Sequence, residues 1–244
     1  MFVLTRKEIS SFFTSITGYL VVIVFLIFNS LFIWMFHGEF NIFDAGYAQL
    51  DPLFILAPWI FLFLIPAVTM RLFSDEKKSG TLELLLTRPI DEFTIVLSKY
   101  LAGLLIVLVS LLPTLVYFLT VYVLASPAGN VDTGGIWGSY LGLFFLASIY
   151  VAIGVYASSL TDNQIISFII SLLFCFVIYF GFDSLAQLPF FSSFDSLVIK
   201  LGISEHYRSI SRGVVDLRDV VYFVSVVFFF LFLTHHRLLS RKWR

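Results

Sequence analysis

Long stretches without a charged residue constrain this sequence more than any other feature. Residues 19–36 carry no charge, and neither do residues 53–70, 101–131 and 133–161. A run of about 18 apolar residues can cross the hydrocarbon core of a bilayer as a helix. Only 13% of the 244 residues are charged, against about 25% in soluble domains. The chain is therefore predicted to be a multi-pass membrane protein.

The predicted fold class is an all-α membrane protein with a single six-span transmembrane domain over residues 17–244. The proposed spans are 17–36, 53–70, 99–124, 136–160, 164–182 and 219–236. We interpret the first as a retained span and not as a cleaved signal peptide. Residues 1–16 form an amphipathic pattern that predicts a helix lying in the membrane interface before it.

Two features of the spans carry structural expectations. Pro58, Pro66 and Pro113 lie inside predicted spans, where bends are expected because proline frees a backbone carbonyl. The last span has the weakest signal, because its charge-free core is residues 220–234. As a helix that core is about 22 Å long, short against a hydrocarbon core of about 30 Å. It can cross if its flanking charges reach the interface or lie against protein.

The distribution of Lys and Arg predicts the orientation. With six spans both termini lie on one side, and that side carries eleven of the 15 Lys and Arg residues. Cytoplasmic loops of membrane proteins carry the excess of positive charge. Both termini and the 71–98 connection are therefore predicted to be cytoplasmic, and the 183–218 connection external.

Several function classes are disfavoured by residues that the chain lacks. The interiors of the predicted spans hold no ionisable residue, which argues against a proton-driven pump or a voltage sensor. No G-x-x-x-x-G-K-[ST] motif occurs, so the chain carries no recognisable nucleotide-hydrolysing loop. Its four His residues are scattered and its single Cys175 lies among apolar residues, which disfavours a metal site or an intramembrane protease. A channel, a scaffold, or a permease energised by a partner remains.

The cytoplasmic connection, residues 71–98, has the most informative pattern. Ser79 and Gly80 are expected to break the helix that continues from the second span, and Thr81 to cap a short second helix. Pro89 would end that helix. Its apolar face would be formed by Leu82, Leu85 and Leu86. From the residues alone, a solvated loop with an ordinary surface helix stays open as an alternative.

Residues 75–85 read DEKKSGTLELL. An acidic–basic run followed by Gly-Thr-Leu-Glu, several Leu and a closing Pro between spans two and three resembles the signature of ABC-2 type permeases. The resemblance implies that this segment is the coupling helix that docks onto an ABC ATPase subunit, and that residues 1–16 are the connecting helix. The coupling residues expected from it are Glu76, Ser79, Gly80, Thr81, Glu83, Arg88 and Pro89. Among these, Glu76, Glu83 and Arg88 would make polar docking contacts.

The external connection, residues 183–218, mixes apolar and charged residues. Its apolar part, which includes Phe190, Phe191 and Phe194, is too short to cross a membrane and predicts one or two re-entrant or interfacial helices. We expect its charges to pair as Glu205 with Arg208, Asp216 with Arg212, or Asp219 with Arg218. The predicted gate residues are His206, Arg212, Gly213, Asp216, Arg218 and Asp219. A salt-bridged external surface without a gating role is the alternative.

Residues 212–222 read RGVVDLRDVVY. This pattern before the last span resembles one branch of the ABC-2 type permeases, which includes the gliding-motility-associated permease subunits of Bacteroidetes-type bacteria and relatives linked to copper-enzyme maturation. The opening residues 7–13 and 18–21 are most similar to the gliding-motility subunits.

The resemblance implies a non-enzymatic permease subunit of the bacterial inner membrane that exports a substrate and is associated with gliding motility. ATP and Mg²⁺ would bind to the partner ATPase, and this chain would hold no cofactor or metal. The expected partners are that ATPase, a second copy or a related permease, and membrane lipid, but no nucleic acid. Because the spans lack charges that would recognise an ion, a lipid, polysaccharide or peptide is favoured as substrate. A non-transporting membrane anchor for an envelope complex is the alternative.

The orientation can be tested by labelling. A cysteine introduced at residue 78 should resist a membrane-impermeant maleimide in intact cells, because the positive-inside rule places it in the cytoplasm. A cysteine at residue 130 should react. Labelling at residue 78 in intact cells, with none at residue 130, would reverse the predicted orientation.

Overall fold

The computed structural model describes residues 1–186 and 195–242, and within these ranges the chain contains helices and no strand. Six segments are long and apolar enough to cross a membrane, which confirms the predicted number of spans. In chain order these segments are α2 (Ile16–Ser30) with the π-helical turn η1 (Leu31–Met35); α4 (Asp51–Thr69) with α5 (Arg71–Lys78); α7 (Glu92–Leu111) with the 3₁₀ turn η2 (Leu112–Thr114) and α8 (Leu115–Leu124); α9 (Thr133–Leu160); α10 (Gln164–Phe176) with η3 (Val177–Gly181) and α11 (Phe182–Ala186); and α14 (Leu217–Lys242).

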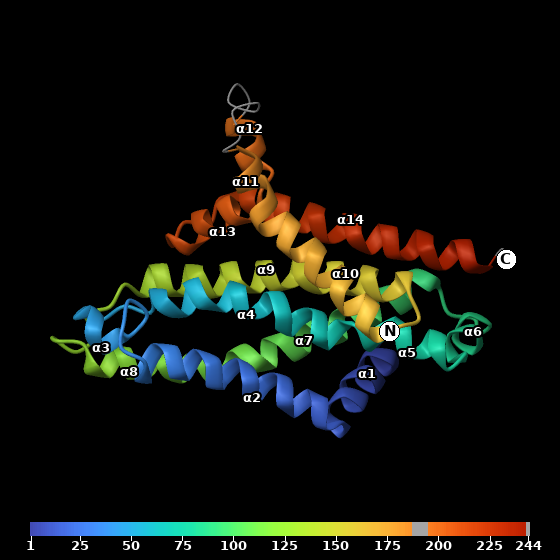
Figure 1. The fold of residues 1–244 in the computed structure, drawn as a ribbon, viewed down its shortest axis with the longest axis horizontal. Coiled ribbons are helices and arrows are strands. Elements are labelled where there is room, and N and C mark those ends of the chain that lie inside the picture. The colour runs from blue at the N-terminus through green and yellow to red at the C-terminus, as the bar shows by residue number, and fades with distance from the viewer. Residues whose placement is uncertain (187–194, 243–244) are drawn as a thin grey trace.

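The remaining helices are short and lie at the ends or the side of the bundle. They are α1 (Phe2–Thr14), α3 (Ile42–Ala45), α6 (Thr81–Leu86), α12 (Asp195–Lys200) and α13 (Ile203–Ser211). In Figure 1, α1, α5, α6 and the end of α14 gather at one end of the bundle, and α3 lies at the opposite end. We call the first of these the α6 end. The helices α11 and α12 project sideways from the bundle (Figure 1).

The three prolines differ in whether they interrupt a helix. Pro58 lies within α4 without ending it, and α4 ends only at Thr69, shortly after Pro66. Pro113 lies in η2, the short 3₁₀ turn that separates α7 from α8. The last span, whose charge-free core was short, belongs to the 26-residue helix α14. The helix continues through the charged residues on both sides of that core. Hydropathy alone therefore underestimated the length of the helix.

Helix α9 forms the centre of the bundle. It packs against α4, α7, α10, α13 and α14, and 78% of its most apolar window is buried, against 17% for the span Gln164–Ala186. Glycines on α9 allow the close approach of its neighbours. A Cβ atom added to Gly154 would lie 2.0 Å from Oγ1 of Thr69, and one added to Gly142 would lie 3.2 Å from the ring of Tyr207.

The contact between Gly154 and the fully buried Thr69 yields a stability prediction. The variant Gly154→Ala forces α4 and α9 apart, because the Thr69 side chain is β-branched and packed on every side. Overpacking of this kind costs about 1–3 kcal/mol. Thermal unfolding in detergent, followed by tryptophan fluorescence, should show a lower Tm than the wild type.

The control is Gly134→Ala on the same helix, where the nearest atom to an added Cβ is 3.5 Å away. That variant should keep the wild-type Tm. Equal Tm values for both variants would show that the α4–α9 contact is looser than described.

Candidate functional site

The helix α6 stands at the end of a sharp turn. Helix α5 ends at Lys78, and Gly80 follows with a φ of +70°, a backbone conformation that favours glycine. The predicted helix break at Ser79 and Gly80 is therefore confirmed. Thr81 was expected to cap α6, and that assignment is wrong. Gly80 occupies the cap position, while the Thr81 hydroxyl donates to the backbone carbonyl of Glu76 at 3.4 Å and lies 2.9 Å from the Ser79 hydroxyl.

One face of α6 is buried and the other is exposed. Leu82 is 1% exposed, whereas Leu84 is 68% exposed. Glu83, Arg88 and Pro89 are also exposed, so these predicted docking residues lie on the accessible side. Between α6 and α1 runs a groove of about 470 Å³, whose lining includes Val3, Leu4, Lys7, Glu76, Leu84, Leu85 and Arg88. Aliphatic walls with charges at the rim are suited to binding another protein.

Glu76 does not face outward with the other predicted docking residues. Its side chain is 14% exposed, and its carboxylate lies 2.9 Å from Nζ of Lys99 and 3.4 Å from Nζ of Lys7. Glu8 on α1 also binds Lys99, at 3.2 Å. The carboxylate of Glu76 is thus engaged within the protein, although Glu76 also lines the groove between α1 and α6, and its docking contact stays a prediction. We call Lys7, Glu8, Glu76 and Lys99 the Lys99 cluster.

Lys99 is the first residue of the predicted third span, and its side chain is only 2% exposed. Its ammonium group also donates to the backbone carbonyl of Leu72 at 2.6 Å and lies 5.0 Å from the Phe73 ring centroid. A buried ammonium is tolerated only when its donors meet acceptors and opposite charge. The sequence analysis expected no ionisable residue in the interiors of the spans. Lys99, at the edge of the third span, is nevertheless buried, and Glu8 of α1 and Glu76 of α5 supply the compensating charge.

The junction between α4 and α5 is capped by a residue from another helix. Ser158 of α9 accepts hydrogen bonds from the backbone N–H groups of Phe73 and Ser74, at 2.9 and 3.1 Å. It donates to the carbonyl of Met70 at 2.9 Å. The first N–H groups of a helix have no partner within it, so Ser158 serves as a tertiary cap for α5.

Further polar contacts hold the rest of α5. The Lys77 ammonium donates to the carbonyl of Ser159, and the Gln164 side chain donates to Asp75. On the α1 side, Arg71 donates to the Ser15 hydroxyl at 3.1 Å. Helix α5 is therefore fixed to α1, α7, α9 and α10, and it presents α6 from a rigid base.

The described residues of the connection predicted to be external, which we call the external segment, pair their charges differently from the prediction. His206 binds Asp219 through Nδ1 at 2.7 Å and the carbonyl of Lys200 through Nε2 at 2.8 Å. Arg208 lies 3.8 Å from Asp183, so the expected pair with Glu205 is wrong. Asp219, expected to pair with Arg218, is buried against His206. The predicted residues Phe190, Phe191 and Phe194 lie outside the described residues.

Four more of the predicted gate residues lie at the turn between α13 and α14. Asp216 accepts a hydrogen bond from the backbone N–H of Arg218 at 3.0 Å, so it caps α14 and does not pair with Arg212. Both Arg212 and Arg218 are exposed. Gly213 has a φ of +82°, and a Cβ atom there would lie 2.9 Å from the backbone of Gly134. Gly213 therefore serves the close packing of this turn on α9.

Helix α13 packs against α9 and α14. The Tyr207 hydroxyl donates to the carbonyl of Phe54 in α4 at 2.7 Å. Burial raises the pKa of Tyr207, so the phenol stays protonated and keeps donating this bond. Together α13, α9 and α4 fix the external segment to the centre of the bundle.

The sequence profile of the ABC-2 family transporter proteins matches residues 8–190, well over half of the 244 residues. The chain belongs to the ABC-2 family of transporter proteins. No curated protein matches it.

The ABC-2 assignment makes this chain a membrane-spanning, non-catalytic subunit of a transporter. The matched region runs from α1 to α11 in full or in part, and it includes the whole of α5, α6 and α7. The Lys99 cluster, apart from Lys7, and the exposed face of α6 therefore lie within the portion that defines the family.

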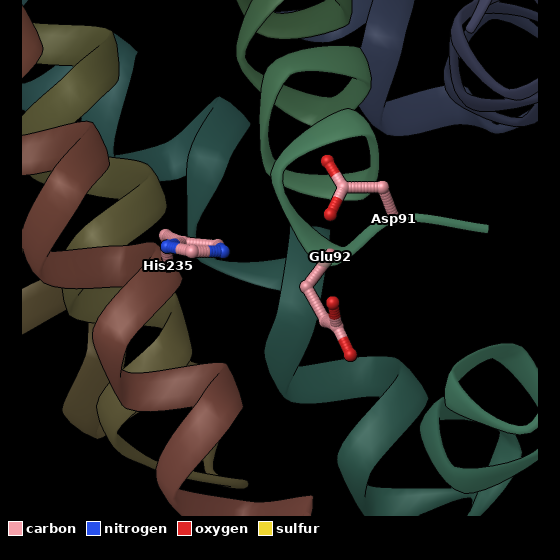
Figure 2. A group of neighbouring side chains, drawn as sticks. All are labelled: Asp91, Glu92 and His235. Carbon is pink, nitrogen blue, oxygen red and sulfur yellow. The ribbon is translucent and has the colours of Figure 1, made fainter.

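One group of side chains in the described residues could approach a metal ion. Ligand atoms of Asp91, Glu92 and His235 lie within 4.8 Å of one another, and Figure 2 shows Asp91 and Glu92 at the start of α7, across from His235 on α14. A helix N-terminus favours negative charge, and the His235 ring packs edge-on against Phe93. These interactions account for the arrangement, so we assign no metal to it, and the absence of a bound metal stays a prediction.

Sequence reasoning missed Glu8, Lys99 and Ser158. A signal for Lys99 was available, because it follows Ile95 by four residues and precedes Gly103 by four, and both face the interior. Residues at this spacing share one face of a helix. Ser158 gave no such signal, since a serine in an apolar helix is common.

Replacing Ser158 tests whether its hydroxyl group stabilises the start of α5. Ser158→Ala leaves the buried N–H group of Phe73, one of the first in α5, without its side-chain acceptor, at a cost of about 1–3 kcal/mol. Unfolding in detergent should therefore occur at a lower denaturant concentration than in the wild type. The control is Ser225→Ala, which removes an exposed hydroxyl bonded within α14. A Ser158→Ala protein as stable as the Ser225→Ala protein would contradict the capping role.

Proposed function

We propose that the chain is the permease subunit of an ABC-2 type transporter, energised by a separate ATPase that docks on α6. The observation that carries this proposal is the geometry of α6. A short helix with one buried and one exposed face stands at the end of the bundle, beyond a glycine turn, on a base fixed to four other helices. Exposed Glu83 and Arg88 supply charges of both signs beside the exposed Leu84.

Family membership supports the same arrangement, because ABC-2 permeases in general work with an ABC ATPase and as dimers. In the proposed complex ATP and Mg²⁺ bind to the ATPase, and this chain binds neither. Two copies of the six-span unit, or one copy and a related permease, enclose the substrate path. Closure of the ATPase around ATP pushes on α6 and biases the bundle between two rigid-body states.

The finer assignment rests on sequence patterns. We propose an exporter of the bacterial inner membrane with both termini in the cytoplasm, supported by the gathering of Lys and Arg at the α6 end. The similarity of residues 212–222 and of the opening residues to gliding-motility-associated permeases supports a role in gliding. The substrate class favoured by spans with so few charges is a lipid, polysaccharide or peptide. In this proposal His206, Asp219 and the Gly213 turn position the external segment and do no chemistry.

The docking surface can be tested by charge reversal. Glu83→Lys places a cation on the exposed face of α6, where it opposes the complementary charge on the ATPase and removes one polar contact. The tagged variant should insert in the membrane normally but capture less of the ATPase that copurifies with the wild-type chain.

The matched control is Glu39→Lys, the same change at an exposed residue of the opposite end of the bundle. It should leave ATPase capture unchanged. Undiminished capture by Glu83→Lys would remove the docking role from α6, and a wild-type chain that captures no ATPase would overturn the proposed function.

A further inference from the structure

The Lys99 cluster joins three segments that are distant in the sequence. Glu8 belongs to α1, Glu76 to α5 and Lys99 to α7. Two cations and two anions make up the cluster, so it is formally neutral. The side chains of Glu8 and Glu76 are 15% and 14% exposed, so water screens these contacts only weakly.

Burial makes this contact difficult to open. Separating α5 from α7 would take Glu76 and the Leu72 carbonyl away from the Lys99 ammonium, and separating α1 would take away Glu8. Either movement removes a partner from a cation whose side chain is only 2% exposed. Breaking a buried ion pair in this way is far more costly than breaking a surface pair. The three helices therefore move together.

Glu76 connects the cluster directly to α6. Its carboxylate binds Lys99, and its backbone carbonyl accepts the hydrogen bond from the Thr81 hydroxyl at 3.4 Å. Thr81 is the first residue of α6. A displacement of α6 thus reaches Lys99 through one intervening residue.

We propose that Lys99 is a positioning residue for energy coupling, an inference that rests on the proposed function. It locks α5 and α1 to α7, so that a push on α6 moves the third span together with the second. Without the Lys99 ammonium, α5 keeps its hydrogen bonds to Ser158 and Ser159 of α9. The ATPase then still docks on α6, but α5 moves relative to α7 and the push is not carried into the third span.

The experiment measures whether α5 and α7 move as one body. Spin labels are placed at Lys78, at the exposed end of α5, and at Leu105, which is 42% exposed on α7. The chain is studied in nanodiscs with the ATPase that copurifies with it, without nucleotide and after trapping with ATP and vanadate. In the wild type the distance between the labels should be the same in both states. In Lys99→Met it should shift on trapping, while ATPase capture persists.

Two variants separate positioning from stability. Lys99→Arg keeps the charge and should restore the constant distance, whereas Lys200→Met, which removes an exposed Lys, should behave as the wild type. If Lys99→Met does not fold, Glu76→Gln, which keeps the shape of the side chain but removes the charge that pairs α5 with Lys99, should show the shift. A constant distance in the folded charge-removing variant overturns the positioning role. A wild-type chain that captures no ATPase instead overturns the proposed function on which it rests.

Discussion

A single buried ammonium group organises the α6 end of this protein. Lys99 projects from α7 into a place where water does not reach, so its charge must be neutralised by protein. Glu8 and Glu76 supply the anions, and the Leu72 carbonyl supplies a further acceptor. The need to neutralise Lys99 explains why the N-terminal helix α1 and the helix α5 pack against α7. The orientation of α6, which is attached to α5 through the Ser79–Gly80 turn, follows from it.

The rest of the bundle is arranged around α9, whose glycines and serines replace bulky side chains. Gly154 and Gly142 let α4 and Tyr207 approach closely, and Ser158 caps α5 where it continues from α4. Because lipid is as apolar as leucine, helices in a membrane associate through close packing and hydrogen bonds more than through hydrophobicity. The same helix therefore holds the external segment at one end and the base of α6 at the other.

Much of the fold could be predicted from the sequence, because long uncharged runs have few alternatives to a membrane-spanning helix. The break at Ser79 and Gly80 and the apolar face of α6 were also readable, since glycine and helical spacing act locally. The partners of charged groups were not. Glu76 pairs with Lys99, and Asp219 pairs with His206 and not with Arg218. Neither pair could be predicted, because the sequence does not state which helices lie beside each other. Ser158 acts on α5 only through tertiary contact, so no local pattern could have shown its role.

The central claim is that the exposed face of α6 receives an ATP-hydrolysing partner. Photo-crosslinking from this face tests it most directly, with a benzophenone amino acid at Leu84 and a second probe at Val214, which is also 68% exposed but lies in the turn between α13 and α14. After irradiation of native membranes, the account predicts that Leu84 captures a nucleotide-binding protein and that Val214 does not. Capture of that protein from Val214 alone would contradict the account.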